Sequence, residues 1–196
     1  MAVVSGPSGV GKGTICQYIV DNYSDFFLSV SATSRAPRSI EQDGVHYYFK
    51  TNEEFEDMIK NDELLEYAQY VGKYYGTPKA PCAAHIEKGE NVILEIEVQG
   101  GMKVKKKAPD TVMIFVVPPS VGELKSRLSG RGTETGDVIA KRLERAKDEL
   151  ALMEDYDYIV VNNDVKEAAE QIVGIMHSEA LKTKHSLKYI KEDLGL

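Results

Sequence analysis

The sequence predicts an α/β protein with a three-layer core, in which helices cover both faces of a parallel β-sheet. Five short runs rich in branched apolar residues, at 3–5, 26–31, 91–98, 111–117 and 157–161, are typical of parallel strands that are buried on both faces. Helical stretches separate most of these runs. The first run leads into "SGPSGVGKGT", a glycine-rich loop that precedes a helix, and this order favours a phosphate-binding fold.

The glycine-rich loop departs from the usual pattern at one position. The stretch from Gly6 to Lys12 fits G-x-x-x-x-G-K-[ST], but Gly13 replaces the final hydroxyl residue. The glycines let backbone N–H groups approach a phosphate, and the helix that follows directs its positive end at the same anion. An ordinary glycine-rich turn is the alternative, which the lysine in register disfavours. Thr14 is the nearest remaining hydroxyl, and we expect it to serve Mg²⁺ through water, because nucleotide-bound Mg²⁺ keeps several waters.

Length, charge and cysteine usage limit the possible functions. A chain of 196 residues is long enough for one α/β domain with a smaller insertion. The net charge of −7 argues against general binding of nucleic acid or of anionic membranes, so phosphate affinity must come from local Arg and Lys residues. Cys16 and Cys82 lack metal-ligand spacing, and neither a secretory leader nor a membrane-spanning run is recognised. We therefore expect reduced thiols and a cytoplasmic protein.

The segment from about Ala32 to Pro81 interrupts the alternation of strands and helices. It contains hairpin-like pieces around a helix whose capping box is formed by Thr51 and Glu54. We interpret it as a small mixed α+β insertion that carries a second substrate's pocket. Four of its tyrosines are expected to fill a thin core: Tyr48, Tyr67, Tyr70 and Tyr74. Further helices are predicted near 120–129, 137–153 and 165–184, followed by a frayed polar tail.

Seven further motifs occur in a fixed order along the chain. They are "SVSATSRAPR", "DGVHYYF", "LLEYAQYVGKYYGT", "ILEIEVQG", "PPS", "GRGTET" and "DYIVVNND". Together with the loop, they resemble guanylate kinases over about residues 2–175. These enzymes transfer the γ-phosphoryl group of ATP to GMP with Mg²⁺, so the resemblance implies ATP and GMP as partners and Mg²⁺ as the cofactor. It also implies a core of residues 1–31, 82–129 and 150–196, a GMP-binding insertion at 32–81 and a helical lid at 130–149.

The resemblance assigns residues to each part of the reaction. The expected catalytic cations are Lys12, Arg38, Arg131 and Arg142, because phosphoryl transfer depends on positioning and on charge neutralisation. The expected contacts of ATP are Gly6, Pro7, Ser8, Gly9, Val10, Gly11, Lys12, Gly13, Thr14 and, near the adenine, Asn162. Those of the GMP phosphate are Ser31, Arg35, Arg38, Tyr47 and Tyr75, and those of the guanine base are Glu66, Thr77 and Glu97.

Elementary chemistry agrees with the phosphate set. Arg35 and Arg38 present two guanidinium forks three residues apart, which suits a dianionic monophosphate. We expect Arg127 and Arg145, at helical spacing from the catalytic cations, to form structural ion pairs. Two other functions are alternatives to this interpretation: a non-catalytic binding module of the same fold, and a kinase of another phosphorylated small molecule, such as a ribose bisphosphate. The intact Lys12 disfavours the first function, and the guanine-reading set disfavours the second.

Overall fold

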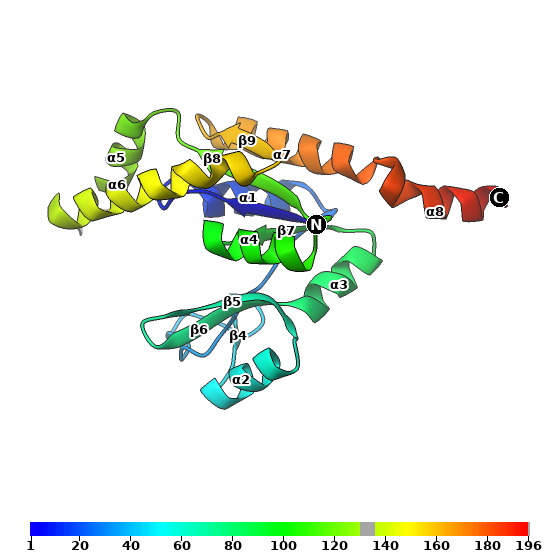
Figure 1. The fold of residues 1–196 in the computed structure, drawn as a ribbon, viewed down its shortest axis with the longest axis horizontal. Coiled ribbons are helices and arrows are strands. Elements are labelled where there is room, and N and C mark those ends of the chain that lie inside the picture. Colours follow the sequence, from blue (N-terminus) through cyan, green and yellow to red (C-terminus); the bar gives the residue numbers. More distant parts are fainter. Residues whose placement is uncertain (130–135, 196) are drawn as a thin grey trace.

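A parallel sheet forms the centre of the molecule. The protein is described by a computed structural model that covers residues 1–129 and 136–195. The sheet has the order β2-β7-β1-β8-β9, and each strand pair is parallel. Figure 1 shows this sheet among the helices, with β7, β8 and β9 labelled. Its strands are β1 (Ala2–Ser5), β2 (Phe26–Leu28), β7 (Asn91–Glu95), β8 (Val112–Val117) and β9 (Tyr158–Val161). The predicted α/β class is therefore confirmed, although four of the five predicted runs extend past the ends of their strands.

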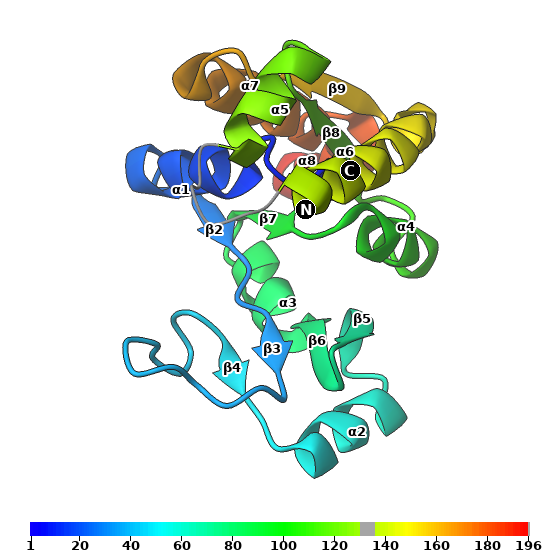
Figure 2. The same cartoon turned by 90° about the vertical axis from the view of Figure 1, so that its left-hand side faces the viewer.

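Alternate residues of the central strand β1 pack into two different cores. Ala2 and Val4 join the helices α1 (Lys12–Asn22) and α7 (Val165–Ala180) in one apolar cluster. Val3 joins a second cluster with α3 (Lys79–Glu87) and α4 (Val98–Lys107). Because successive side chains of a strand point to opposite faces, the sheet lies between two helical layers. Figure 2 shows α1 and α4 on opposite sides of it.

The segment after β2 forms a second, mixed sheet below the first (Figures 1 and 2). Its order is β4-β3-β6-β5, with β3 (Ala32–Thr33) parallel to β4 (Tyr48–Phe49) and antiparallel to β6 (Lys73–Pro78), which pairs with β5 (Leu64–Tyr70). Helix α2 (Asn52–Lys60) starts at the predicted capping box of Thr51 and Glu54, and it buries Phe55 against this sheet. The predicted mixed α+β character of this segment is thus confirmed.

The tyrosine prediction is half correct. Tyr48 and Tyr74 pack against the small apolar cluster of the second sheet, where the Tyr74 ring stacks on Phe55 at 5.2 Å between ring centroids. Tyr67 and Tyr70 are 38% and 67% exposed, so the prediction is wrong for these two. The cluster is short, and the outer half of β5 extends beyond it toward the hairpin tip.

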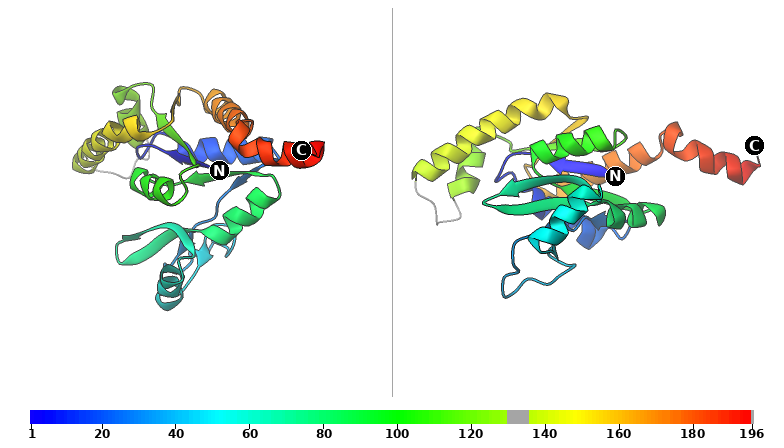
Figure 3. Two further views of the ribbon diagram at one scale, coloured as in Figure 1. Left: turned by 45° about the vertical axis from the view of Figure 1, so that its right-hand side comes forward. Right: turned by 60° about the horizontal axis from the view of Figure 1, so that its bottom comes forward.

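Four helical segments belong to the C-terminal part of the chain. They are α5 (Val121–Ser129), α6 (Gly136–Leu150), which continues as a 3₁₀ turn (Ala151–Asp155), α7, and α8 (Thr183–Leu194). The predicted frayed tail is wrong, because α8 is a helix that projects from the body (Figure 3). Its Leu, Lys and Glu residues favour helix, and Gly195 ends it in the left-handed conformation with φ of 68°. None of the described helices is long and apolar enough to span a membrane.

Candidate active site

The phosphate-binding loop follows β1 and leads into α1. Gly6 has φ of 146°, and a Cβ at this residue would lie 2.2 Å from the carbonyl oxygen of Val116 on β8. Gly11 has φ of 91°, and its Cβ would lie 2.6 Å from the side-chain nitrogen of Asn162. Both positions therefore require glycine for conformation and for space. The loop fits tightly against the end of the sheet, at the N-terminus of α1, where an anion is favoured.

Lys12 folds back over this loop. Its Nζ donates to the carbonyl oxygens of Gly6 at 2.6 Å and Pro7 at 3.2 Å. Burial lowers the pKa of Lys12, while the nearby carboxylates of Glu95, Glu149 and Glu97 oppose this effect. The two hydrogen bonds hold the ammonium group at the loop.

A cleft of about 780 Å³ opens between the two sheets and α6. Many of the sequence-predicted site residues meet there although they come from separate segments. The lining includes Gly6, Ser8 and Lys12 of the loop, Ser31, Tyr47, Glu66 and Tyr75 around the second sheet, Glu97 after β7, and Arg142 on α6. One cavity thus joins a phosphate-binding loop to a second binding surface.

The part of the cleft that the second sheet lines contains a buried carboxyl group. Thr77 on β6 donates its hydroxyl to Glu66 on β5 at 2.8 Å, and both side chains are buried. Burial raises the pKa of Glu66, an effect that the Thr77 hydrogen bond and the nearby Lys103 oppose. The backbone of Gly100 on α4 comes so close that a Cβ there would lie 3.2 Å from the second carboxylate oxygen. A carboxylate fixed in this way suits a ligand that presents hydrogen-bond donors.

The two predicted arginines of the insertion lie just outside the cleft lining. The Arg35 guanidinium contacts Glu41 through two hydrogen bonds, at 2.8 Å and 2.9 Å, and lies 5.4 Å from the centroid of the Tyr47 ring. The Arg35 hydrogen bonds lower the pKa of Glu41 to about 2. The backbone N–H of Arg38 donates to the same carboxylate at 2.7 Å, and its side chain is exposed. Glu41 therefore occupies the guanidinium fork of Arg35.

Helix α6 contributes two arginines from the opposite wall. Arg142 donates to the Ser8 hydroxyl of the loop at 2.7 Å. Arg145 forms ion pairs with Glu97 at 2.8 Å and Glu149 at 2.9 Å, so the expected ion-pair role is confirmed for Arg145. Arg131, the remaining predicted cation, lies outside the described residues.

The candidate metal side includes one residue that sequence reasoning missed. Thr14 is exposed on the first turn of α1. Glu95, at the carboxyl end of β7, lines the cleft, and a Cβ at Gly13 would lie 3.9 Å from its Oε2 atom. An acidic residue at the carboxyl end of the strand beside β1 was the available signal. No cluster of three or more potential metal ligands occurs among the described His, Cys, Asp and Glu residues, so a metal would also need oxygens from a ligand.

Asn162 has a contact different from the one the resemblance implies. It is 3% exposed, and its side-chain Nδ2 donates to the carbonyl oxygen of Val10 in the loop at 2.6 Å. Arg127 on α5 donates to the Asn162 carbonyl at 3.0 Å and pairs with Glu123 at 2.9 Å. The expected ion pair of Arg127 is thus confirmed, and the residue also contacts the loop.

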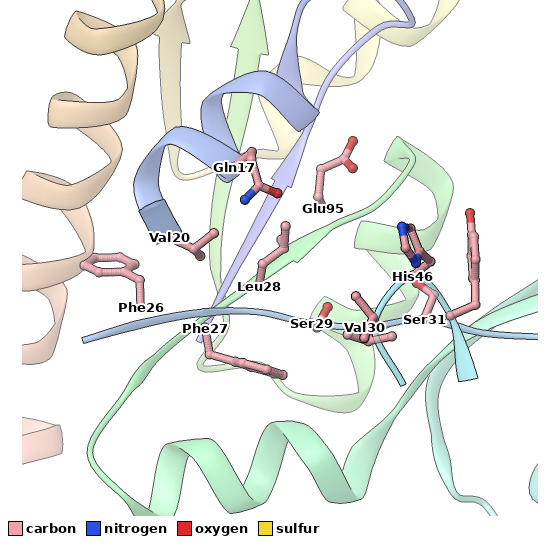
Figure 4. Close-up of a pocket in the computed structure, with 12 residues that line it drawn as sticks. Gln17, Val20, Phe26, Phe27, Leu28, Ser29, Val30, Ser31, His46 and Glu95 are labelled. Atoms are coloured by element: carbon pink, nitrogen blue, oxygen red, sulfur yellow. The ribbon is translucent and has the colours of Figure 1, made fainter. Parts of the chain in front are cut away.

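A second pocket of about 450 Å³ adjoins the cleft beside the segment that leads from β2 to β3 (Figure 4). Figure 4 shows Gln17 and Val20 of α1 above the segment 26–31, with His46 of the insertion at one end. The two cavities share Ser31, Tyr47 and Glu95. The insertion is therefore separated from α1 by open space on this side.

The loop with its lysine, the buried carboxylate across the cleft and the arginines of α6 together define a P-loop nucleotide kinase. The family profile described as guanylate kinase matches residues 1–179. This chain belongs to the guanylate kinase family.

Named relatives are similar over almost their whole length. The guanylate kinase of Streptococcus mutans serotype c is 52% identical over 201 residues, which cover 100% of this chain and 96% of the relative. That of Halalkalibacterium halodurans is 50% identical over 188 residues, 96% of this chain and 92% of the relative. The crystal structure of guanylate kinase from Anaplasma phagocytophilum matches with a TM-score of 0.75 at 33% identity, over 98% of this chain and 93% of that chain.

Proposed function

We propose that this chain transfers the γ-phosphoryl group of ATP to GMP and releases ADP and GDP. The observation that carries the proposal is the buried carboxyl group of Glu66, which accepts from Thr77 and lines the same cleft as Lys12. A kinase of a sugar phosphate has no use for a buried carboxylate aimed at a base. A non-catalytic binding module has no use for Lys12 and Arg142 at an intact phosphate-binding loop.

We assign the triphosphate of ATP to the loop. Its backbone N–H groups and the N-terminus of α1 suit the β-phosphate, and Lys12 and Arg142 suit the γ-phosphate. Lys12 Nζ donates to the carbonyl oxygens of Gly6 and Pro7. It can exchange these neutral oxygens for phosphate oxygens when ATP enters.

We assign the phosphate of GMP to the tyrosines and arginines at the mouth of the insertion. Tyr47 and Tyr75 line the cleft, and Arg35 lies behind them with Glu41 in its guanidinium fork. A phosphate dianion that displaces Glu41 would exchange one bidentate oxyanion for another, which costs little electrostatic energy. Arg38, whose side chain is exposed on the same turn, would complete the site.

Mg²⁺ is the cofactor that we propose for the ATP side. Thr14 and Glu95 would hold it through its water ligands, and their hydroxyl and carboxylate oxygens are the donors that Mg²⁺ prefers. When bound, the ion neutralises charge on the β- and γ-phosphates. Glu95 supplies a carboxylate oxygen near Gly13, which has no hydroxyl to offer.

The reaction needs positioned cations more than a base. An oxygen of the GMP phosphate attacks the γ-phosphorus, the bond from that phosphorus to the β-phosphate bridging oxygen breaks, and ADP leaves with the electron pair. The attacking phosphate is already an anion, so no proton has to be removed. Lys12, Arg38 and Arg142 are the described candidates that would neutralise the transferred group. The division into core, insertion and lid, with Arg131 in the lid, stays a prediction.

A coupled assay of ADP release tests this function. ATP is supplied with GMP, AMP, CMP, UMP or a ribose bisphosphate, and Lys12→Ala serves as the inactive control. We expect rapid turnover with ATP and GMP, and not with the other four acceptors. Preference for the ribose bisphosphate would establish the other kinase, and GMP binding without turnover would establish the binding module.

A further inference from the structure

The carbonyl group of Val10, in the phosphate-binding loop, accepts from two side chains outside the loop. Val10 is fully buried, and its carbonyl oxygen accepts from Asn162 Nδ2 at 2.6 Å. Arg127 Nη1 approaches the same oxygen at 3.4 Å. A buried carbonyl without a partner would be costly, so these two donors account for the position of this part of the loop.

The two donors are themselves fixed by their surroundings. The backbone N–H of Asn162 donates to Val117 of β8 at 2.8 Å, which anchors the turn after β9 to the sheet. Arg127 donates to the Asn162 carbonyl at 3.0 Å, and its Nε contacts Glu123 at 2.9 Å. The loop is therefore braced by groups from α5 and from the β9–α7 turn.

The geometry of the Val10–Gly11 peptide links these hydrogen bonds to the direction of the Gly11 N–H. The peptide between Val10 and Gly11 is planar and trans, so its C=O and N–H bonds point in opposite directions. A carbonyl held against Asn162 directs the Gly11 N–H away from Asn162. Gly11 permits the approach, because a Cβ there would lie 2.6 Å from Asn162 Nδ2. If this peptide rotated, its carbonyl oxygen would point toward a bound anion, and its N–H donor would point away from it.

We propose that Asn162, assisted by Arg127, is a positioning residue for the donor phosphates: it fixes the Val10–Gly11 peptide so that the Gly11 N–H serves the phosphate cradle. The inference rests on the proposed function only for the identity of the donor nucleotide. This positioning role is different from a direct contact between Asn162 and the adenine base. The buried side chain would have to give up the Val10 hydrogen bond, or expose new surface, in order to read a base.

The test uses a donor with no base. Asn162→Asp keeps the shape of the side chain but replaces the donor to Val10 with a carboxylate oxygen. Isothermal titration with magnesium-loaded ATP, magnesium-loaded tripolyphosphate and GMP is compared for wild type and variant. We expect the affinities for ATP and tripolyphosphate to fall together, by about 10-fold, while the affinity for GMP stays within about twofold. Asn163→Asp is the matched control, because the neighbouring side chain is exposed and the charge change is the same.

Each other outcome overturns the inference. A loss for ATP alone would mean that Asn162 contacts adenine. Equal losses for ATP, tripolyphosphate and GMP would mean a general structural role, and no loss would mean no role. If Asn162→Asp does not fold, Arg127→Lys keeps the charge, removes the fork that reaches Val10 and Asn162, and is expected to give the same pattern. A wild type that binds tripolyphosphate but does not phosphorylate GMP would refute the proposed function and leave this test intact.

Discussion

The Arg145 guanidinium lies 2.8 Å from the carboxylate of Glu97 and so links α6 to the end of β7 across the cleft. Its second partner, Glu149, belongs to the same helix. Arg142, one turn earlier on α6, contacts Ser8 of the phosphate-binding loop instead. The two arginines therefore face different halves of the cleft, and we expect different kinetic roles for them.

Arg142→Gln should lower kcat and kcat/KM for GMP by roughly 10³-fold, because a cation that acts on the transferred phosphoryl group stabilises mainly the transition state. Arg145→Gln should change kcat less than about fivefold, because an exposed ion pair contributes little free energy. Steady-state kinetics with saturating ATP provide the measurement, and the two variants serve as controls for each other. Equal losses would place Arg145 among the catalytic cations.

The sequence predicted the loop, the sheet and the meeting of distant motifs, because these depend on local patterns and on one family resemblance. It did not predict the contacts that depend on tertiary packing. The guanidinium of Arg35 is bound by Glu41, six residues later, and Asn162, which follows the edge strand β9, contacts the loop. The exposed Tyr70 shows the same limit, since its apolar ring gave no sign that the cluster of the second sheet ends before it.

The metal assignment can be tested at Thr14 and Glu95. Thr14→Ala should lower kcat about 10- to 100-fold at low Mg²⁺, as expected when an outer-sphere partner is lost, and leave the affinity for GMP unchanged. Glu95→Gln should raise the Mg²⁺ concentration needed for half-maximal turnover. Gly13→Ser should be tolerated, because its Cβ would make an ordinary van der Waals contact with Glu95 at 3.9 Å. Full kcat of both Thr14→Ala and Glu95→Gln across a Mg²⁺ titration would refute the assignment.

Glu66 should make the free protein less stable at neutral pH. Burial raises the pKa of this carboxyl above its ordinary value of 4.5, so the folded state binds the proton more tightly than the unfolded state. The stability that the protonated form contributes is therefore lost as the pH rises through the raised pKa. Glu66→Gln removes the buried charge, and its Tm at neutral pH should equal or exceed that of wild type. The Tm difference between variant and wild type should vanish below the ordinary pKa. Calorimetry across this pH range provides the measurement. A lower Tm for Glu66→Gln than for wild type at neutral pH would contradict the prediction.

The same carboxylate should determine the choice of acceptor nucleotide. Guanine presents an N1–H and a 2-amino group side by side, and the ionised Glu66 can accept from both while Thr77 holds it in place at 2.8 Å. Adenine has an acceptor at N1 and no 2-amino group, so its entry would leave Glu66 with Thr77 as a donor but with no donor from the base. A site of this kind can discriminate by ~10⁴-fold, whereas apolar fit alone gives ~200-fold at most.

Glu66→Gln should therefore lower the ratio of kcat/KM for GMP to that for AMP by about 100-fold or more, because the amide has one acceptor oxygen and adds a donor. In wild type, KM for GMP should rise as the pH falls through the raised pKa of Glu66, since protonation removes an acceptor. Glu63→Gln is a matched control, because this exposed carboxylate lies three residues earlier and outside the cleft lining. The measurements are kcat/KM for both nucleotides in the three proteins, with the pH series for wild type and Glu66→Gln. A ratio that Glu66→Gln leaves unchanged would remove Glu66 from guanine recognition and favour a kinase of another acceptor.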